Sequence, residues 1–193
     1  MHNLIIRRMR PGDLASLDRQ LGQRQYFADR LERQSGGLGV LLVAWQGDAP
    51  IGHVFLWLAP AEEPEIRTHL RDVPLITHLE VHPGHRGQKV GTRLLEAAER
   101  QLAAMGHHKV ALAVEESNTA AARLYIRLGY ASWPHEQVKC YSYPDEHGHR
   151  FVELCDVMEK PLAPEVPAAE AQPEVSHDRA EVVLATVPLP VRL

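Results

Sequence analysis

A short basic turn that carries two glycines lies near the middle of the chain, between an apolar run and an amphipathic segment. It reads His-Arg-Gly-Gln-Lys-Val-Gly over residues 85–91. The free N–H groups in the first turn of a helix point outward, and the helix dipole adds positive potential there. Glycine lets the backbone approach a phosphate without an intervening Cβ. The turn therefore predicts an anion-binding site at the start of a helix.

The segments on either side of this turn must position it. Leu75–Val81 is apolar and rich in β-branched residues, which is typical of a buried strand. Thr92–Ala104 has the period of an amphipathic helix, and Gly106 stands where a helix C-cap is expected. Many α/β proteins place a glycine turn before a helix, and this one matches neither the GxGxxG nor the Walker A pattern. By itself the turn therefore does not identify a protein family.

Composition limits the function classes. The chain has 193 residues, 45% of them hydrophobic and 24% charged, which suits one soluble domain. A formal net charge of −4 argues against a nucleic-acid binder, and no apolar run is long enough for a membrane span.

No signal peptide is expected, because the first residues lack its apolar stretch, and Cys140 and Cys155 are the two cysteines of the chain. We expect a cytoplasmic protein with reduced thiols. Metal-binding HExxH and Cys-x-x-Cys units do not occur, so no metal is expected.

Hydrophobic periodicity and turn signals predict seven strands and four main helices. The expected strands are Leu4–Met9, Val40–Trp45, Ile51–Leu58, Leu75–Val81, Val110–Val114, Val138–Tyr143 and Phe151–Met158. The expected helices run from Pro11 or Asp13 to Leu21, and over residues 25–34, 92–104 and 118–128. The pattern predicts an α/β (α+β) fold whose mixed central sheet of about seven strands carries helices on both faces. Residues 1–160 form this domain, and 161–193 form a Pro/Ala/Glu-rich tail, with a short strand at 182–187 as one interpretation of its end.

Two motifs resemble those of the GNAT superfamily of acyl-CoA-dependent N-acetyltransferases. The first joins Val81-His82-Pro83 to Arg86-Gly87-Gln88-Lys89-Val90-Gly91 and then to Thr92-Arg93-Leu94-Leu95. It is similar to the family's pyrophosphate-binding motif, except that Lys89 stands where the family usually has a glycine. The second motif comprises Asn118, Ala121, Leu124, Tyr125, Gly129 and Tyr130. The resemblance covers residues 3–160 and implies the GNAT fold.

The resemblance implies that acetyl-CoA is the co-substrate. Backbone groups of Leu79 and Val81 would contact its pantetheine and thioester. The pyrophosphate would lie against the residues of the first motif, which are Arg86, Gly87, Gln88, Lys89, Val90, Gly91 and Thr92. Lys89 either adds charge toward the phosphates or weakens binding through its Cβ. Asn118 is expected to cap its helix and also to touch the co-substrate.

Acetyl transfer to an amine needs an acid for the departing thiolate and a base for the amine. A tyrosine with an ordinary pKa of about 10 is protonated at neutral pH, so Tyr125 is the candidate acid. Glu80 is the candidate base, acting through a water, with His78 in reserve and His53 behind it. Each of these residues also fits a purely structural role. Cys140 is expected to be a buried thiol rather than a nucleophile.

By resemblance, the acceptor pocket lies between the early helices and the late hairpin. These segments carry Tyr26, Phe27, Asp29, Glu32, Tyr141, Tyr143, Asp145, Glu146 and Glu153. The acidic balance fits a cationic amine, although the same charges fit a solvated surface. We expect a small-molecule amine substrate, with a protein N-terminus or lysine as the alternative and a homodimer as a possible assembly. A non-catalytic domain that binds acyl-CoA or a protein partner is the third hypothesis.

Overall fold

The computed structural model describes residues 4–144 and 147–163. The strand expected at 182–187, most of the expected tail, and the acidic residues Asp145 and Glu146 lie outside the described residues. Within the described ranges no helix is long and apolar enough to cross a lipid bilayer.

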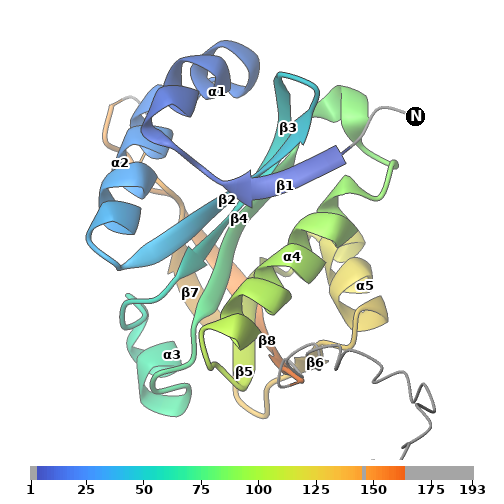
Figure 1. Cartoon of the computed structure of the whole chain (residues 1–193). Helices are drawn as coiled ribbons and strands as arrows, with labels where there is room; N and C mark the ends of the chain where they lie inside the picture. The colour runs from blue at the N-terminus through green and yellow to red at the C-terminus, as the bar shows by residue number, and fades with distance from the viewer. Residues whose placement is uncertain (1–3, 145–146, 164–193) are drawn as a thin grey trace, which may run out of the picture.

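Eight strands and five α-helices follow one another in the described part of the chain (Figure 1). The strands are β1 (Leu4–Arg8), β2 (Gly39–Gln46), β3 (Ala49–Trp57), β4 (Leu75–Val81), β5 (Lys109–Glu115), β6 (Ala131–Ser132), β7 (Val138–Tyr141) and β8 (Val152–Pro161). The helices are α1 (Leu14–Leu21), α2 (Arg24–Ser35), α3 (Pro64–His69), α4 (Val90–Ala104) and α5 (Thr119–Arg127). Short 3-10 helices occupy Pro11–Asp13 and Pro83–His85.

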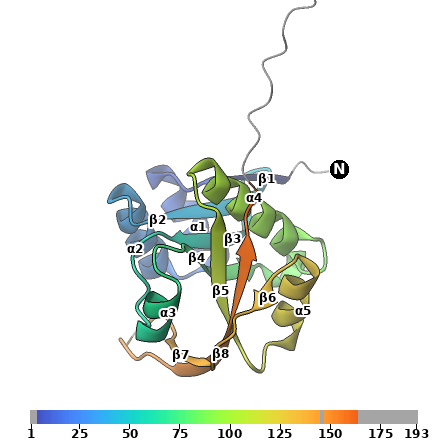
Figure 2. The same ribbon diagram turned by 90° about the horizontal axis from the view of Figure 1, so that it is seen from below.

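The strands form one mixed sheet in the order β1-β2-β3-β4-β5-β8-β6, with β7 paired to β8 (Figure 2). Strands β4 and β5 are parallel, and the other neighbours are antiparallel. The expected fold class is therefore confirmed, with eight strands rather than about seven. The additional strand is β6, whose two residues are too few to show a strand period.

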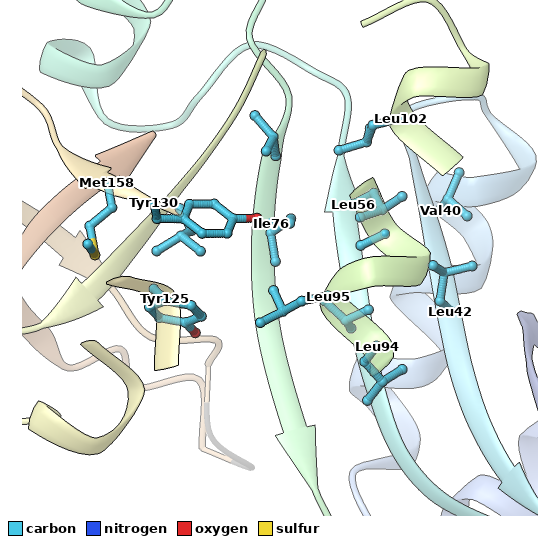
Figure 3. Close-up of a cluster of buried hydrophobic side chains, with 14 of the residues drawn as sticks. Val40, Leu42, Leu56, Ile76, Leu94, Leu95, Leu102, Tyr125, Tyr130 and Met158 are labelled. Atoms are coloured by element: carbon cyan, nitrogen blue, oxygen red, sulfur yellow. The ribbon is translucent and has the colours of Figure 1, made fainter. Parts of the chain in front are cut away.

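Each face of the sheet carries its own hydrophobic layer. Helices α4 and α5 cover one face, where Leu94, Leu95 and Tyr125 meet side chains such as Leu56 and Ile76 (Figure 3). Helices α1, α2 and α3 cover the other face through Leu17, Tyr26, Phe27 and Ile66, which pack against Phe55 and other strand residues. Burial on both faces explains why β2 and β3 read as continuous apolar runs rather than as alternating ones. Both faces of the sheet are thus covered by helices, and the ends of its strands lie next to the loops.

The folded domain extends slightly beyond the expected boundary at residue 160. Pro161 is the last residue of β8, where a missing N–H costs little, and Leu162 is buried in the layer beneath α4 and α5. The Leu162 N–H donates to the carbonyl of His108. Composition alone had assigned both residues to the tail, because a proline before an Ala/Glu-rich stretch resembles a linker.

Candidate active site

Strands β4 and β5 pair over only part of their length. Their ladder contains Leu75 opposite Ala111 and Ile76 opposite Leu112, whereas β5 and β8 pair over all seven residues of β5. A cavity of about 880 Å³ opens where the two strands no longer pair. Its lining includes Thr77, His78 and Leu79 from β4, and Ala113 and Glu115 from β5. The sheet therefore has a gap in its middle, with the reserve base His78 at the edge.

A β-bulge at His78 reshapes β4 at this gap. Thr77 lies opposite Phe55, and Glu80 lies opposite His53. Between these two pairs, β4 therefore contains one residue more than β3. His78 takes up the extra residue in the left-handed region, at φ +51°. Thr77 and His78 both line a small cavity on the α2 side, and Leu79 packs on the α4 side. The bulge thus brings two consecutive side chains to one face, which strict alternation from Ile76 would not do.

Aromatic side chains from three elements complete the larger cavity. Tyr26 enters from α2, Tyr125 from α5, and Tyr141 and Tyr143 from β7 and the residues after it. The rings of Tyr26 and Tyr143 meet edge to face, with centroids 5.1 Å apart. Glu153 of β8 also lines the cavity. Tyr26, Tyr141, Tyr143 and Glu153, four of the residues expected at the acceptor pocket, thus line one cavity.

Three other expected acceptor residues lie elsewhere. Phe27 is completely buried in the layer between α2 and the sheet. Asp29 faces its own helix, where its Oδ2 accepts a hydrogen bond of 3.2 Å from Arg33 Nε. Glu32 is exposed, and it is not among the cavity's lining residues. The acidic side chains of α2 that were expected at the acceptor pocket are therefore not among the residues that line the cavity.

Tyr125 lies at the junction of the α5 layer and the cavity. Its side chain is 8% exposed, and burial raises the pKa of its phenol. The ring of Tyr130 lies 5.8 Å away, but the Tyr130 hydroxyl donates to Glu99 in the core. The hydroxyl of Tyr125 is therefore protonated at neutral pH and borders the cavity.

Glu80 faces α2 and lies outside the set of described residues that line the cavity. Its Oε2 accepts a 3.1 Å hydrogen bond from Gln23 and lies 3.5 Å from His53 Nε2, which is too long for a well-formed hydrogen bond. The imidazole of His53, followed by the Gln23 hydrogen bond, lowers the pKa of Glu80 to about 2. A carboxylate with so low a pKa accepts protons poorly.

His78 lines the cavity directly. Its ring stacks on Tyr26 with centroids 4.4 Å apart. His78 is exposed along the cavity, and the partial loss of hydration among these walls, followed by the nearby His53 and Arg30, lowers the pKa of His78 to about 4. The imidazole is therefore neutral at physiological pH, with a ring nitrogen able to accept a proton. Of the two base candidates on β4, His78 is the one that borders the cavity.

The glycine turn forms the start of α4, which begins at Val90, two residues before the expected Thr92. Lys89 is the N-cap residue and has φ +63°, a conformation that favours glycine. The lysine side chain is exposed, so its charge faces solvent rather than the core. Arg86 Nε donates to the carbonyl of Val81 at 3.1 Å, which ties the turn to the end of β4. The backbone N–H groups of residues 90–92 belong to the first helical turn and have no acceptor within the helix.

Gly91 is a glycine that the protein's own packing does not require. It lies in the first turn of α4, and a Cβ built on it would lie 3.7 Å from Val81 and 3.9 Å from Leu124, at ordinary contact distances. Glycine in a helix costs roughly 0.5–1 kcal/mol relative to alanine. The same distances place the start of α4 beside the open end of β4 and beside α5. The missing Cβ leaves backbone accessible at this junction.

Asn118 is confirmed as a helix cap. Its Oδ1 accepts a 3.1 Å hydrogen bond from the N–H of Ala121 at the start of α5. Gly129 ends the same helix at φ +90°, as expected for a C-cap glycine.

The two cysteines line the cavity from β7 and β8. Cys140 is half-buried rather than buried, and Cys155 is buried. Contact with the Cys155 thiol, together with burial, raises the pKa of Cys140. Cys140 is therefore a thiol rather than a thiolate, which makes it a poor nucleophile.

Arg30 and Gln23 are polar residues of this region that the sequence pattern did not single out. Arg30 is 8% exposed and lies among the aromatic rings of α2 and β3. Its spacing of three and four residues from Phe27 and Tyr26 places it on the same helix face. That spacing was the available signal, although an arginine is usually assigned to the solvated face.

The model of the Acetyltransferase (GNAT) family matches residues 5–130. The chain belongs to the GNAT family. The acetyl transferase GW6a of Oryza sativa subsp. japonica is 32% identical over 116 residues, which make up 57% of this chain and 26% of that protein. The chain thus spans about a quarter or less of the length of the curated relatives it matches.

Solved structures show the same fold at low identity. The ribosomal-protein-S18-alanine N-acetyltransferase of Escherichia coli superposes with a TM-score of 0.61 at 20% identity, over 83% of this chain and 95% of that one. The PaiA N-acetyltransferase of Thermoplasma acidophilum, solved in complex with coenzyme A, gives a TM-score of 0.60 at 16% identity, over 82% and 99%. At these identities the likeness establishes the GNAT fold.

The left-handed backbone at Lys89 leads to a stability prediction. Lys89→Gly removes a Cβ from this conformation, whereas Lys89→Ala removes the charge and keeps the Cβ. We expect the glycine variant to exceed the alanine variant in free energy of unfolding by about 1 kcal/mol, as measured by urea denaturation. We expect both variants to keep the wild-type affinity for acetyl-CoA in calorimetric titration. A loss of affinity shared by both would show that the lysine charge contacts the co-substrate.

Proposed function

We propose that this chain is an acetyl-CoA-dependent N-acetyltransferase that acts on a primary amine of a small molecule. The observation that carries this proposal is the cavity at the gap between β4 and β5, with Tyr125 in its wall. The start of α4 adjoins the open end of β4 at this gap, through Gly91 beside Val81. A thioester and an anionic diphosphate could thus be held by neighbouring parts of one site.

The residues at the start of α4 fit coenzyme A. The N–H groups of Val90, Gly91 and Thr92 would donate hydrogen bonds to the pyrophosphate, with the helix dipole adding positive potential. Gly87 at φ +75° turns the chain, and Arg86 adds a positive charge beside it. The backbone of Leu79 and Val81, beyond the last pair with β5, would contact the pantetheine and the thioester. Gln88 and Asn118 remain expected contacts, and Lys89 would contribute its backbone rather than its charge.

Tyr125 would act as the general acid. The amine nitrogen forms a bond to the thioester carbonyl carbon, the C–S bond breaks, and the departing sulfur takes the phenolic proton. The resulting phenolate regains a proton from solvent. The raised pKa of Tyr125 keeps the proton in place until a thiolate forms. The raised pKa of Cys140 favours this direct transfer over an acyl-cysteine intermediate.

His78 would take the proton released by the amine nitrogen, directly or through a water. Its position in the cavity wall and its neutral ring support this role. A nitrogen already bonded to the carbonyl carbon is far more acidic than a free ammonium, so a base with a pKa of about 4 suffices. Glu80, the base first expected, would instead fix the orientation of Gln23 beneath this site through their hydrogen bond.

The walls of the cavity favour a small acceptor over a protein lysine. Tyr26, Tyr141 and Tyr143 line the α2 side with aromatic rings, where an extended peptide would need an open groove. Calorimetric titration with acetyl-CoA, followed by thiol release across a panel of amines, amino acids and peptides, tests both parts of the proposal. Micromolar binding together with thiol release on a small amine would support it. Absence of binding at millimolar acetyl-CoA would instead favour a non-catalytic partner-binding domain.

The acid role of Tyr125 predicts a loss of turnover on removal of its hydroxyl. Tyr125→Phe should lower kcat by about 100-fold and leave the affinity for acetyl-CoA within about twofold. Tyr130→Phe is the matched control, because it removes a neighbouring hydroxyl that bonds Glu99 in the core. The control should lose stability while keeping kcat. Equal kcat in Tyr125→Phe and wild type would remove Tyr125 from the mechanism.

The two base candidates are separated by a pair of amide variants. His78→Asn should lower kcat by about 100-fold because it removes the proton acceptor from the cavity wall. Glu80→Gln keeps the side-chain shape beside Gln23 and should lower kcat by less than about tenfold. Initial rates of thiol release at saturating substrates measure both effects. The reverse ranking would restore Glu80 as the base.

A substitution at Gly91 should affect the stability of the fold and the affinity for acetyl-CoA differently. In Gly91→Ala the new Cβ fits against Val81 and Leu124, so the free energy of unfolding should stay constant or rise by up to about 1 kcal/mol. The same Cβ would intrude on a bound pyrophosphate, and the affinity for acetyl-CoA should fall by about tenfold or more. Gly12→Ala, in open space away from the site, is the control and should change neither. Unchanged affinity in Gly91→Ala would contradict the assignment of the turn.

A further inference from the structure

Arg30 is a buried cation at the acceptor end of the site. Its guanidinium carbon lies 4.9 Å from the ring centroid of Tyr26, 4.8 Å from that of Phe55, and 5.2 Å from that of Tyr143. Trp57 adds a fourth ring at 5.5 Å. These rings partly offset the cost of burying the charge through cation–π attraction. A guanidinium still needs acceptors for the N–H groups in its plane, and aromatic faces do not provide them.

The hydrogen bonds of Arg30 are incomplete. Its Nε and Nη1 atoms are buried and have no hydrogen-bond acceptor among the described residues. Asp29 Oδ2 lies 3.4 Å from Nη1 without a hydrogen bond, and it already accepts one from Arg33. Buried donors without acceptors are costly, and native proteins rarely keep them without a use. The ion pair with Asp29 therefore leaves two buried donors of Arg30 without hydrogen-bond acceptors among the described residues.

The space beside Arg30 adjoins the larger cavity. Arg30 lines a cavity of about 100 Å³, enough for a carboxylate-sized group. Both cavities share Thr77, His78, Tyr141 and Tyr143 as lining residues. A group bound beside Arg30 would thus share a cavity wall with His78, the proposed base.

The other charges around the small cavity leave Arg30 available. Arg150 also lines it, but Arg150 Nη2 bonds Glu62 Oε2 at 3.0 Å. Glu63 is half-buried and borders both cavities, where it could face the ammonium group of a substrate. The arrangement offers a positive and a negative group to one small molecule.

We propose that Arg30 binds the carboxylate of the acceptor, and that the acceptor is an amine that also carries a carboxylate, such as an amino acid. The planar guanidinium matches a carboxylate through paired N–H donors. This proposal rests on the proposed function and narrows its substrate class. It also replaces a purely cationic acceptor, expected from the net charge of the whole chain, with a zwitterionic one.

Binding of an acid and its amide tests the subsite without any turnover. Phenylacetate and phenylacetamide are titrated into the full chain, and the same titrations are repeated with Arg30→Met and Arg33→Met. Methionine keeps much of the arginine stem and removes the charge, and Arg33 is the control one turn away that also lies over Trp57. We expect the acid to bind about tenfold more tightly than the amide in wild type and Arg33→Met. The preference should vanish in Arg30→Met.

Thiol release then separates this proposal from the proposed function. With acetyl-CoA, phenylalanine should exceed phenylethylamine in kcat/KM by about tenfold, through KM, and Arg30→Met should equalise the two. Carboxylate preference without thiol release from any amine would overturn the transferase and keep the subsite. Equal binding of acid and amide to the wild type, or an undiminished preference in Arg30→Met, would overturn the subsite. Urea denaturation checks that Arg30→Met is folded.

Discussion

The partial pairing of β4 with β5 is the constraint on which the rest of the site depends. Two parallel strands that paired fully would leave no room between them, and the backbone groups of β4 would be used up in the ladder. Here the ladder stops after Ile76, so the second half of β4 has one paired edge and one edge toward the cavity. The bulge at His78 then turns that side chain into the same cavity. Cavity, backbone edge and base candidate thus arise from one local break in sheet regularity.

The two faces of the sheet present different surfaces at the gap, and the proposed function uses both. On the α4 and α5 side, Gly91, Val81 and Leu124 meet where a charged co-substrate would need exposed backbone. On the α2 side, tyrosine rings and a buried guanidinium offer shape and charge to a smaller partner. The gap between β4 and β5 is where these two surfaces meet. A transfer reaction needs such an arrangement, because donor and acceptor must approach one atom from different directions.

Much of this could be predicted from the sequence, and the failures have physical reasons. Most helices and strands could be located from apolar runs and from the helix-ending glycines Gly106 and Gly129, because these signals depend on neighbouring residues in the sequence. Two motifs placed the turn and Tyr125 correctly in the fold. The bulge could not be predicted from the sequence, because His78 adopts a left-handed backbone conformation in which glycine is the usual residue. Arg30 was missed because its burial depends on rings from β3 and from the segment after β7, which are distant in sequence.

The short ladder between β4 and β5 also fixes the angle at which the two strands diverge. The strands are joined at Leu75 and Ile76, and Val81 lies about 17 Å further along at the usual rise of a strand. Because β4 remains paired to β3 as far as Val81, a change of about 4° in this angle would move both strands together and displace Val81 by roughly 1 Å relative to β5. Such a displacement of reacting groups is enough to cost about a hundredfold in rate. Ile76, Ala111 and Leu112 are buried and paired at the closed end of the gap, so their packing sets its width from outside the proposed site.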